Sequence, residues 1–318
     1  MRQPLPTFLV AGAARSGTTG LVEGLRKHPD VFVTHPKEPH YFALHGTEVN
    51  FCGPGDDHTI NRVAVTDLDD YFALYSTSHS YKARGDGSVS TMYYYQRALP
   101  EILRVNPEMR LVILLREPVA RAYSSFQYMR ARGFEPMDDF LEALAAEPAR
   151  RRAGYHHLWH YTKMSFYADS LTAMHEALGD ARLGVWFHDE LEYDFTGTIA
   201  EVLRFLGVAH VTERQGSIPR VNISGDPRSK VFQRTIWRAT GNDAMRRAVK
   251  LLTTYRFRER VRRLALRPSA VSAEALENLR PVFDDDLGRV LAVLERLPNR
   301  RSVPGWLASA ALRSGLRE

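Results

Sequence analysis

The sequence predicts an α/β fold: a parallel sheet of the phosphate-loop type, flanked by helices and followed by a helical C-terminal portion. Short apolar runs alternate with helical patterns through the first two thirds of the chain, as is typical of parallel strands covered on both faces. A glycine-containing loop separates the first apolar run from the first helical pattern. From about residue 229 to residue 318 the pattern is helical, with breaks near Gly241, Pro268 and Pro298.

The first part of the sequence alternates clearly between the two patterns. Leu21, Val22 and Leu25 share one face of the first expected helix. A later stretch rich in Gly, Asp and His predicts a loop, and Thr66 or Asp67 is suited to cap the helix that follows it. The expected elements are strands over 9–11, 31–33 and 81–83, helices over 18–28, 67–75 and 98–106, and a loop over 44–65.

A continuous Leu-Val-Ile-Leu-Leu run over 111–115 predicts the most deeply buried strand. The pattern continues without an internal repeat, a low-complexity tract or a linker. We therefore expect one domain over residues 1–318, of which about 229–318 is the helical portion. The other elements expected before that portion are a strand over 183–187 and helices over 119–132, 137–147, 165–178 and 196–206.

Composition narrows the class of protein. The formal net charge of +6 suits anionic ligands, but it does not distinguish nucleic acid, a membrane surface and acidic small molecules. Cys52 is the only cysteine, so no disulfide can form within the chain.

No apolar run approaches the roughly 20 residues that span a bilayer. Pro4 and Pro6 interrupt the apolar start, which we interpret as the first strand and not as a signal peptide, and we expect a cytoplasmic protein.

The loop after the first strand has the spacing of a phosphate loop. Gly17 follows Gly12 by five residues, and a helical pattern begins at Thr18, where a Walker nucleotide triphosphatase has Lys. Free backbone N–H groups and the helix dipole favour an anion here. The loop is therefore predicted to hold a nucleotide phosphate but is poorly suited to ATP hydrolysis. The alternative is an ordinary strand–turn–helix connection.

Two further segments follow the ends of expected strands, where ligands of open α/β sheets bind. After the second strand, Glu38 is a candidate proton acceptor, with His35 and His40 as rivals; the alternative is a solvated turn. After the strand over 111–115, Arg116 and the helical Ser124 offer a guanidinium and a hydroxyl, which suit a phosphate monoester.

A fourth segment lies late in the chain, in a Gly- and Pro-containing loop that precedes a helical pattern. Its two cations and hydroxyl could close over a nucleotide, and a solvated basic turn is an equal alternative. The residues concerned are Arg228, Ser229 and Lys230.

These segments together resemble one enzyme family. The run Arg-Ser-Gly-Thr-Thr over 15–19 is similar to the 5′-phosphosulfate loop of sulfotransferases that use 3′-phosphoadenosine-5′-phosphosulfate (PAPS), in the Golgi heparan-sulfate branch and its bacterial relatives. Residues 37–42 resemble the Lys-Glu-x-x-Phe-Phe stretch of that branch, whose Glu is the catalytic base. Residues 111–124 closely resemble the family's 3′-phosphate motif. The resemblance extends from about residue 8 to residue 306.

The resemblance implies an enzyme that moves a sulfuryl group from PAPS to an acceptor hydroxyl by in-line transfer and needs no metal. Glu38 would be the base, and Arg15 would neutralise charge on the bridging oxygen. Thr18 argues against the alternative of a small-molecule kinase. A nucleotide- or polyanion-binding module without turnover would need no base at Glu38. The residues assigned to the cofactor are Arg15, Ser16, Gly17, Thr18, Thr19, Arg116 and Ser124, with Arg228, Ser229 and Lys230 as weaker candidates.

One departure from the family pattern concerns charge near the sulfate. The heparan-sulfate enzymes usually have a Lys in a Glu-Lys-Ser-Pro segment, and Gly87 stands at the matching position. We therefore expect Arg15, with Lys82 or Arg84, to supply that charge. The Golgi relatives carry a membrane anchor, whereas this sequence has no apolar run long enough for one. We therefore expect a bacterial, cytoplasmic enzyme.

The expected acceptor is a hydroxyl of a small molecule, glycan or glycolipid and not a nucleic acid. The His- and Tyr-rich stretch over 155–161 predicts a pocket wall for a ring-bearing acceptor, with His40, His156 and His160 as candidate contacts. His156 and His160 lie one helical turn apart, but a metal site would need further ligands. A basic helix over 256–263 is suited to peripheral contact with a membrane, and a solvated face is an equal alternative.

Overall fold

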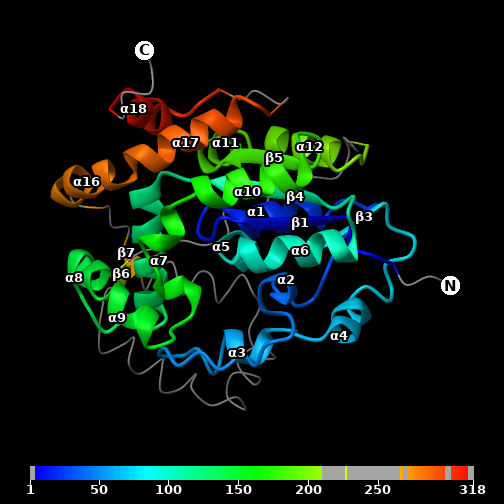
Figure 1. Ribbon diagram of the computed structural model, residues 1–318, viewed down its shortest axis with the longest axis horizontal. Helices are drawn as coiled ribbons and strands as arrows, with labels where there is room; N and C mark the ends of the chain where they lie inside the picture. Colours follow the sequence, from blue (N-terminus) through cyan, green and yellow to red (C-terminus); the bar gives the residue numbers. More distant parts are fainter. Residues whose placement is uncertain are drawn as a thin grey trace.

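The computed structural model describes residues 4–209, 226–227, 266–267, 271, 273–297 and 302–313. Five parallel strands form a sheet in the order β2-β3-β1-β4-β5 (Figure 1). Two short strands form a separate antiparallel ladder. The strands are β1 (Phe8–Gly12), β2 (Val31–Val33), β3 (Ala83–Asp86), β4 (Arg110–Leu115), β5 (Leu183–Phe187), β6 (Asp226–Pro227) and β7 (Leu266–Arg267).

Helices connect the strands and cover both faces of the sheet. None of those in the described ranges is long and apolar enough to cross a membrane. The described helices are α1 (Thr18–Leu25), α2 (Tyr41–Leu44), α3 (Ile60–Val63), α4 (Leu68–Ala73), α5 (Ser90–Tyr93), α6 (Tyr95–Val105), α7 (Pro118–Ala131), α8 (Phe140–Ala145), α9 (Glu147–Arg152), α10 (Ala168–Leu178), α11 (His188–Tyr193), α12 (Phe195–Phe205), α16 (Ala273–Leu279), α17 (Asp284–Leu294) and α18 (Gly305–Arg313), with 3-10 turns η1 (His157–Trp159), η2 (Lys163–Ser165) and η3 (Arg280–Phe283).

The two faces of the sheet carry separate cores because side chains alternate along each strand. On β4, Leu111, Ile113 and Leu115 pack into the larger core, which also contains buried side chains of α6, α7, α10 and α17. Val112 and Leu114 point to the other face and pack with α1 and α12. Helices α17 and α18 pack on each other, and α17 also packs on α10, at the side where the chain is coloured orange to red in Figure 1.

The strand order places a topological switch beside β1. The chain runs from β1 to β2 and β3 on one side of it, and then crosses to β4 and β5 on the other. Ligands bind beyond the carboxyl ends of strands at such a point. The pairing of β1 with β4 continues past the strand, because the Ala13 N–H donates to the Leu114 carbonyl at 2.8 Å. The loop after β1 therefore begins next to the end of β4.

The predicted parallel sheet, its flanking helices and the helical C-terminal part are confirmed, and the strands over 31–33 and 183–187 have the predicted bounds. Several other predictions were wrong. The loop expected over 44–65 contains the helix α3. The helix expected over 137–147 is divided into α8 and α9, since Pro148 begins a new helix. Of the residues expected to form a strand over 81–83, only Ala83 lies in one, as the first residue of β3. The strand β7 lies within the portion predicted to be helical. The single domain stays a prediction.

Candidate active site

The loop between β1 and α1 requires glycine at its last position. Gly17 caps α1 in the left-handed region, with φ of 94°, and a Cβ there would lie 2.9 Å from Cδ2 of Leu191. Arg15 also has a positive φ, of 68°, which is unusual for a residue with a side chain. The first N–H groups of α1 have no partner within the helix and open toward this loop. Thr18 is buried and Thr19 half-buried at its start.

The structure brings three predicted cofactor residues together at the switch point. Arg15 Nε donates to Ser124 Oγ at 3.3 Å, across 109 residues of sequence. Arg116 Nη1 donates to the Arg15 carbonyl at 3.0 Å. The Arg15 guanidinium also lies over the ring of Tyr128, 4.5 Å from its centroid, and Arg132 lies over the same ring at 4.6 Å. Helix α7 and the loop thus share one cationic surface.

Like charges converge on this surface. Burial, with added repulsion from Arg116, Arg132 and Arg121, lowers the pKa of Arg15 to about 10. Burial likewise lowers the pKa of Arg116, although the carboxylates of Glu192 and Asp189 oppose the shift. Guanidinium groups held this close favour a bound anion, because an anion removes their repulsion. The buried hydroxyl of Ser16 has no hydrogen-bond partner among the described residues, which leaves a further donor at the loop.

Arg121 was not among the predicted site residues, and it contacts the backbone of the phosphate loop. Its side chain is fully buried, donates to Ser165 Oγ at 2.6 Å and to the Tyr161 carbonyl, and lies 3.4 Å from the Ala14 carbonyl that it also contacts. An Arg on the buried face of the expected helix over 119–132 was the signal that could have found it.

Tyr128 and His188 were also missed. Tyr128 contacts the Arg15 guanidinium, as described above, and His188 begins α11 within 3.3 Å of a Cβ built on Gly17. No local motif marks either residue, because both reach the loop only through the packing of α7 and α11.

Glu38 lies in a tethered segment after β2. Lys37 Nζ forms an ion pair with Glu38 Oε1 at 2.6 Å, and the Gly87 N–H donates to the Lys37 carbonyl at 2.8 Å. Burial alone would raise the pKa of Glu38. The positive charge of Lys37, the electrostatic effect of His40, the Lys37 hydrogen bond and the charge of Arg15 together outweigh burial, so the pKa of Glu38 lies below its usual range. The carboxylate is therefore ionised at neutral pH.

A buried network holds the backbone beside Glu38. His40 has φ of 60°, its N–H donates to Ser88 Oγ at 3.0 Å, and its Nδ1 lies 2.8 Å from Ser90 Oγ. The buried Asp86 carboxylate accepts from the Ser88 N–H at 2.9 Å and from Tyr71 Oη at 2.7 Å. Burial lowers the pKa of His40, which keeps its ring neutral.

Of the two histidine rivals to Glu38, His40 is buried near the carboxylate, whereas His35 is exposed.

The expectation that Lys82 or Arg84 supplies charge at the site is wrong. Lys82 forms a surface ion pair with Asp30 at 2.8 Å. Arg84 donates to the carbonyls of Leu5 and Tyr81, away from the phosphate loop. Lys82 precedes β3, and Arg84 lies near the amino end of that strand. Both are therefore at the opposite end of the sheet from the site, which lies beyond the carboxyl ends of the strands.

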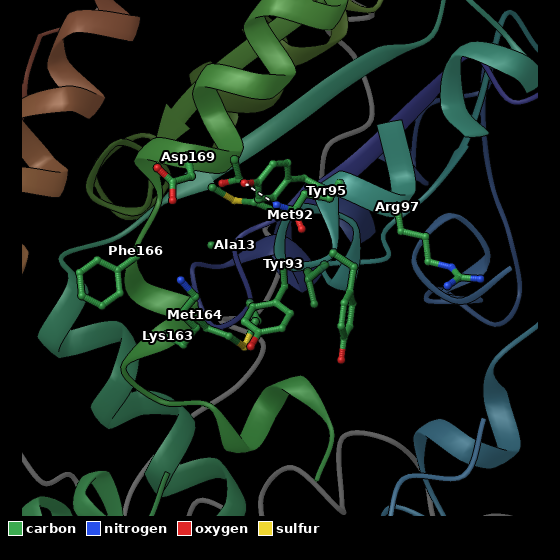
Figure 2. Close-up of a pocket in the computed structure, with 14 residues that line it drawn as sticks. Ala13, Met92, Tyr93, Tyr95, Arg97, Lys163, Met164, Phe166 and Asp169 are labelled. Atoms are coloured by element: carbon green, nitrogen blue, oxygen red, sulfur yellow. Dashed lines mark hydrogen bonds between the residues drawn. The ribbon is translucent and has the colours of Figure 1, made fainter. Parts of the chain in front are cut away.

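A cavity of about 360 Å³ lies next to the phosphate loop, between α5–α6 and η2–α10. Ala13 and Ala14 of the loop line it. Figure 2 shows Lys163 and Phe166 on one side and Tyr93 on another. The mixture of aromatic rings, a cation and small loop residues is suited to a ring-bearing molecule with polar groups.

The predicted histidines form a buried group behind this cavity. His156 Nδ1 accepts from the Leu158 N–H at 2.9 Å, and its Nε2 lies 3.2 Å from the Asp56 carboxylate, an arrangement that suits a neutral ring. Burial lowers the pKa of His156 to about 3 and that of His160 to about 4. His160 Nδ1 lies 2.7 Å from Tyr93 Oη, so this histidine reaches the cavity through a lining tyrosine.

The weaker cofactor candidates Arg228, Ser229 and Lys230 lie outside the described residues. The strand β6, just before them in sequence, lies against α7, the helix that carries Ser124. Within the described ranges, no three His, Cys, Asp or Glu side chains are grouped so that they could hold a metal ion.

Residues 6–213 match the model of a protein family described as the sulfotransferase family. The chain belongs to this family. That membership agrees with the phosphate loop, Glu38 and the Arg116–Ser124 pair, all of which lie within the matched residues.

Individual relatives are more distant. Human carbohydrate sulfotransferase 15 is 29% identical over 169 residues, which cover 43% of this chain and 29% of that protein. The membrane-associated sulfotransferase kil1 of Dictyostelium discoideum is 27% identical over 152 residues, covering 46% of this chain and 28% of that protein. The match thus spans less than a third of either relative. A sulfotransferase crystal structure from Alicyclobacillus acidocaldarius shares the fold, with a TM-score of 0.72 and 23% identity over 95% of this chain and 99% of that one.

Proposed function

We propose that this protein transfers a sulfuryl group from PAPS to an acceptor hydroxyl. The observation that carries the proposal is the convergence of Arg15, Arg116 and Ser124 on a phosphate loop that has Thr18 where ATP-hydrolysing enzymes have Lys. Two anionic groups at the ends of one nucleotide fit this surface better than a triphosphate with Mg²⁺ does. Family membership supports the same activity.

The residues present fit PAPS, which when bound supplies the activated sulfuryl group. The N–H groups of Gly17, Thr18 and Thr19 would hold the 5′-phosphate at the start of α1. Arg116 and Ser124 would hold the 3′-phosphate through charge-assisted hydrogen bonds. Arg15, already in contact with Ser124, would oppose negative charge that grows between phosphate and sulfate.

Glu38 would accept the proton of the acceptor hydroxyl. As the acceptor oxygen forms its bond to sulfur, the bond from sulfur to the phosphate oxygen breaks, and the hydroxyl proton passes to the carboxylate. The ionised state of Glu38 and its tethered backbone suit this role. A carboxylate is a weak base, so most of the rate enhancement would come from the positioning of the reactants and from preorganised charge.

The cavity beside Ala13 and Ala14 would receive the acceptor, a small molecule, glycan or glycolipid with a ring. The aromatic side chains that line the cavity can stack on a sugar or aromatic face of the acceptor, and Lys163 can contact a polar substituent. The name of carbohydrate sulfotransferase 15 agrees with a sugar hydroxyl. A screen of a metabolite extract with ³⁵S-labelled PAPS, followed by mass spectrometry, would identify the labelled product.

Nucleotide selectivity tests the proposal directly. By calorimetry, adenosine 3′,5′-bisphosphate should bind far more tightly than ADP or ATP. Arg116→Ala should remove most of this preference, since a lost charge-assisted contact costs roughly 1.5–3 kcal/mol, or about 10- to 150-fold in affinity. Arg204→Ala, which removes an exposed side chain in the last turn of α12, is the matched control and should leave the preference unchanged. Equal binding of ATP by the parent protein would reject the proposal in favour of a kinase.

A further inference from the structure

We propose that Lys37 is a positioning residue that keeps Glu38 ionised and fixes its carboxylate, and that Gly87 leaves the room that the Lys37 side chain needs. The inference rests on the proposed role of Glu38 as proton acceptor. It assigns a function to a residue pair, Lys37 and Gly87, that neither the cofactor surface nor the acceptor cavity uses.

The fit between Lys37 and Gly87 is the first observation. A Cβ built on Gly87 would lie 2.8 Å from Cε of Lys37 and 2.9 Å from Cγ2 of Val22, which is closer than such atoms approach in proteins. The Gly87 N–H also donates to the Lys37 carbonyl at 2.8 Å. The lysine side chain therefore passes over a position that has no side chain of its own, between α1 and the end of β3.

This route directs the lysine charge to one atom. The Lys37 Nζ lies 2.6 Å from Glu38 Oε1, and 15% of the Lys37 side chain and 29% of the Glu38 side chain are exposed. Residues 35–37 form a bend, so the side chains of Lys37 and Glu38 do not point apart as neighbours in a strand do. The Gly87 contact and the hydrogen bond to the Lys37 carbonyl turn the lysine back toward its neighbour.

The charged groups around Glu38 determine how strongly the Lys37 charge affects the protonation of the carboxylate. Lys37 and Arg15 favour the carboxylate, the first from its own segment and the second from the phosphate loop. Asp86, at the end of β3, is buried and interacts unfavourably with Glu38, and His40 is held neutral by burial. Removing the Lys37 charge leaves burial and Asp86 acting on Glu38, opposed by the electrostatic effects of His40 and Arg15, so the pKa of the carboxyl should rise.

The test is a direct titration of Glu38. Protein labelled with ¹³C at glutamate carboxyls is titrated by NMR, and the Glu38 signal is assigned by its loss in Glu38→Gln. In Lys37→Met the titration midpoint should rise by about one pH unit or more, the usual effect of an opposite charge at this distance. Lys37→Arg keeps the charge and should stay near the parent. Lys82→Met removes a surface lysine that lies just before β3 and pairs with Asp30, and it should leave the Glu38 midpoint unchanged.

Gly87→Ala tests the role of the glycine. The added methyl group displaces the Lys37 side chain, so the Glu38 midpoint should rise in the parent background but not further in Lys37→Met. An equal rise in both backgrounds would show that Gly87 acts without Lys37 and would overturn that half of the inference. Each variant should bind adenosine 3′,5′-bisphosphate like the parent, which shows that it is folded.

Two results separate this inference from the proposed function. If Glu38→Gln abolishes turnover but Lys37→Met leaves the Glu38 midpoint in place, Glu38 is the base and the inference about Lys37 is wrong. If Lys37→Met raises the midpoint while Glu38→Gln keeps normal turnover, the ion pair controls ionisation but the proposed base is wrong. A raised midpoint, with the acid limb of the pH–rate profile moved in the same direction, supports both.

Discussion

At the scale of single residues, the site depends on side chains whose charge is set by tertiary neighbours. Arg15 and Glu38 are both partly buried. The pKa of Arg15 is lowered mainly by burial, and that of Glu38 is lowered by the charges beside it. The sequence predicted both as site residues, and that assignment stays a prediction. The sequence also assigned extra charge to Lys82 and Arg84, which the structure places elsewhere, while the adjacent Lys37 lies against Glu38.

Glu38→Gln separates chemistry from binding at this scale. The amide keeps the size of the carboxylate but cannot accept a proton at neutral pH, so turnover should fall by roughly 10²–10⁴. Affinity for adenosine 3′,5′-bisphosphate, measured by calorimetry, should stay nearly unchanged. Near-normal turnover in Glu38→Gln, together with its loss in His40→Ala, would transfer the role of base to the histidine.

At the scale of elements, the strand–loop–helix unit β1–α1 and the helix α7 together form the proposed cofactor surface. The first of them was predicted from glycine spacing. The second was predicted as a helix, but its contacts with Arg15 through Ser124 and Tyr128 depend on the pairing of β1 with β4. The periodicity of a sequence shows which residues share one face of a helix. The order of the strands in the sheet decides which other elements that face contacts.

The two glycines near the start of α1 should respond oppositely to alanine. Gly17→Ala forces a side chain into the left-handed region, at roughly 1–2 kcal/mol, and against Leu191, so the melting temperature and nucleotide affinity should both fall. Gly20→Ala lies within the helix, with only Phe195 at 3.7 Å from the new methyl group, and should stabilise the protein by about 0.5–1 kcal/mol. Thermal unfolding and calorimetry measure both effects, and equal behaviour of the two variants would contradict the loop geometry.

At the scale of the whole molecule, buried neutral histidines link stability to pH. His156, His157 and His160 are nearly inaccessible, and burial holds the pKa of each below that of an unfolded histidine. As the pH falls below about 6.5, the unfolded chain binds protons that the folded chain does not, so the folded state loses stability. The loss continues until the folded pKa is reached, which for His156 is about 3.

Urea unfolding between pH 7 and pH 5 should therefore show falling stability, with each such histidine contributing about 1.4 kcal/mol per pH unit below its unfolded pKa. His156→Gln should reduce the slope by about one proton, whereas the exposed His58→Gln should leave it unchanged. An identical slope in parent and His156→Gln would show that the buried ring does not stay neutral.

The sequence by itself determined the fold class, and it predicted the phosphate loop and site roles for Arg15, Glu38, Arg116 and Ser124, because glycine spacing and apolar runs are local signals that need no knowledge of the partner strand. Tertiary structure decided how these residues meet. Arg121, Tyr128 and His188 reach the loop through contacts over long sequence distances, and the cavity forms where α5–α6 and η2–α10 face each other. Such contacts follow from strand order and helix packing, which no local pattern contains. The same reason explains Lys37: the bend over 35–37 and the space left by Gly87, which follows β3, place its side chain beside the Glu38 carboxylate.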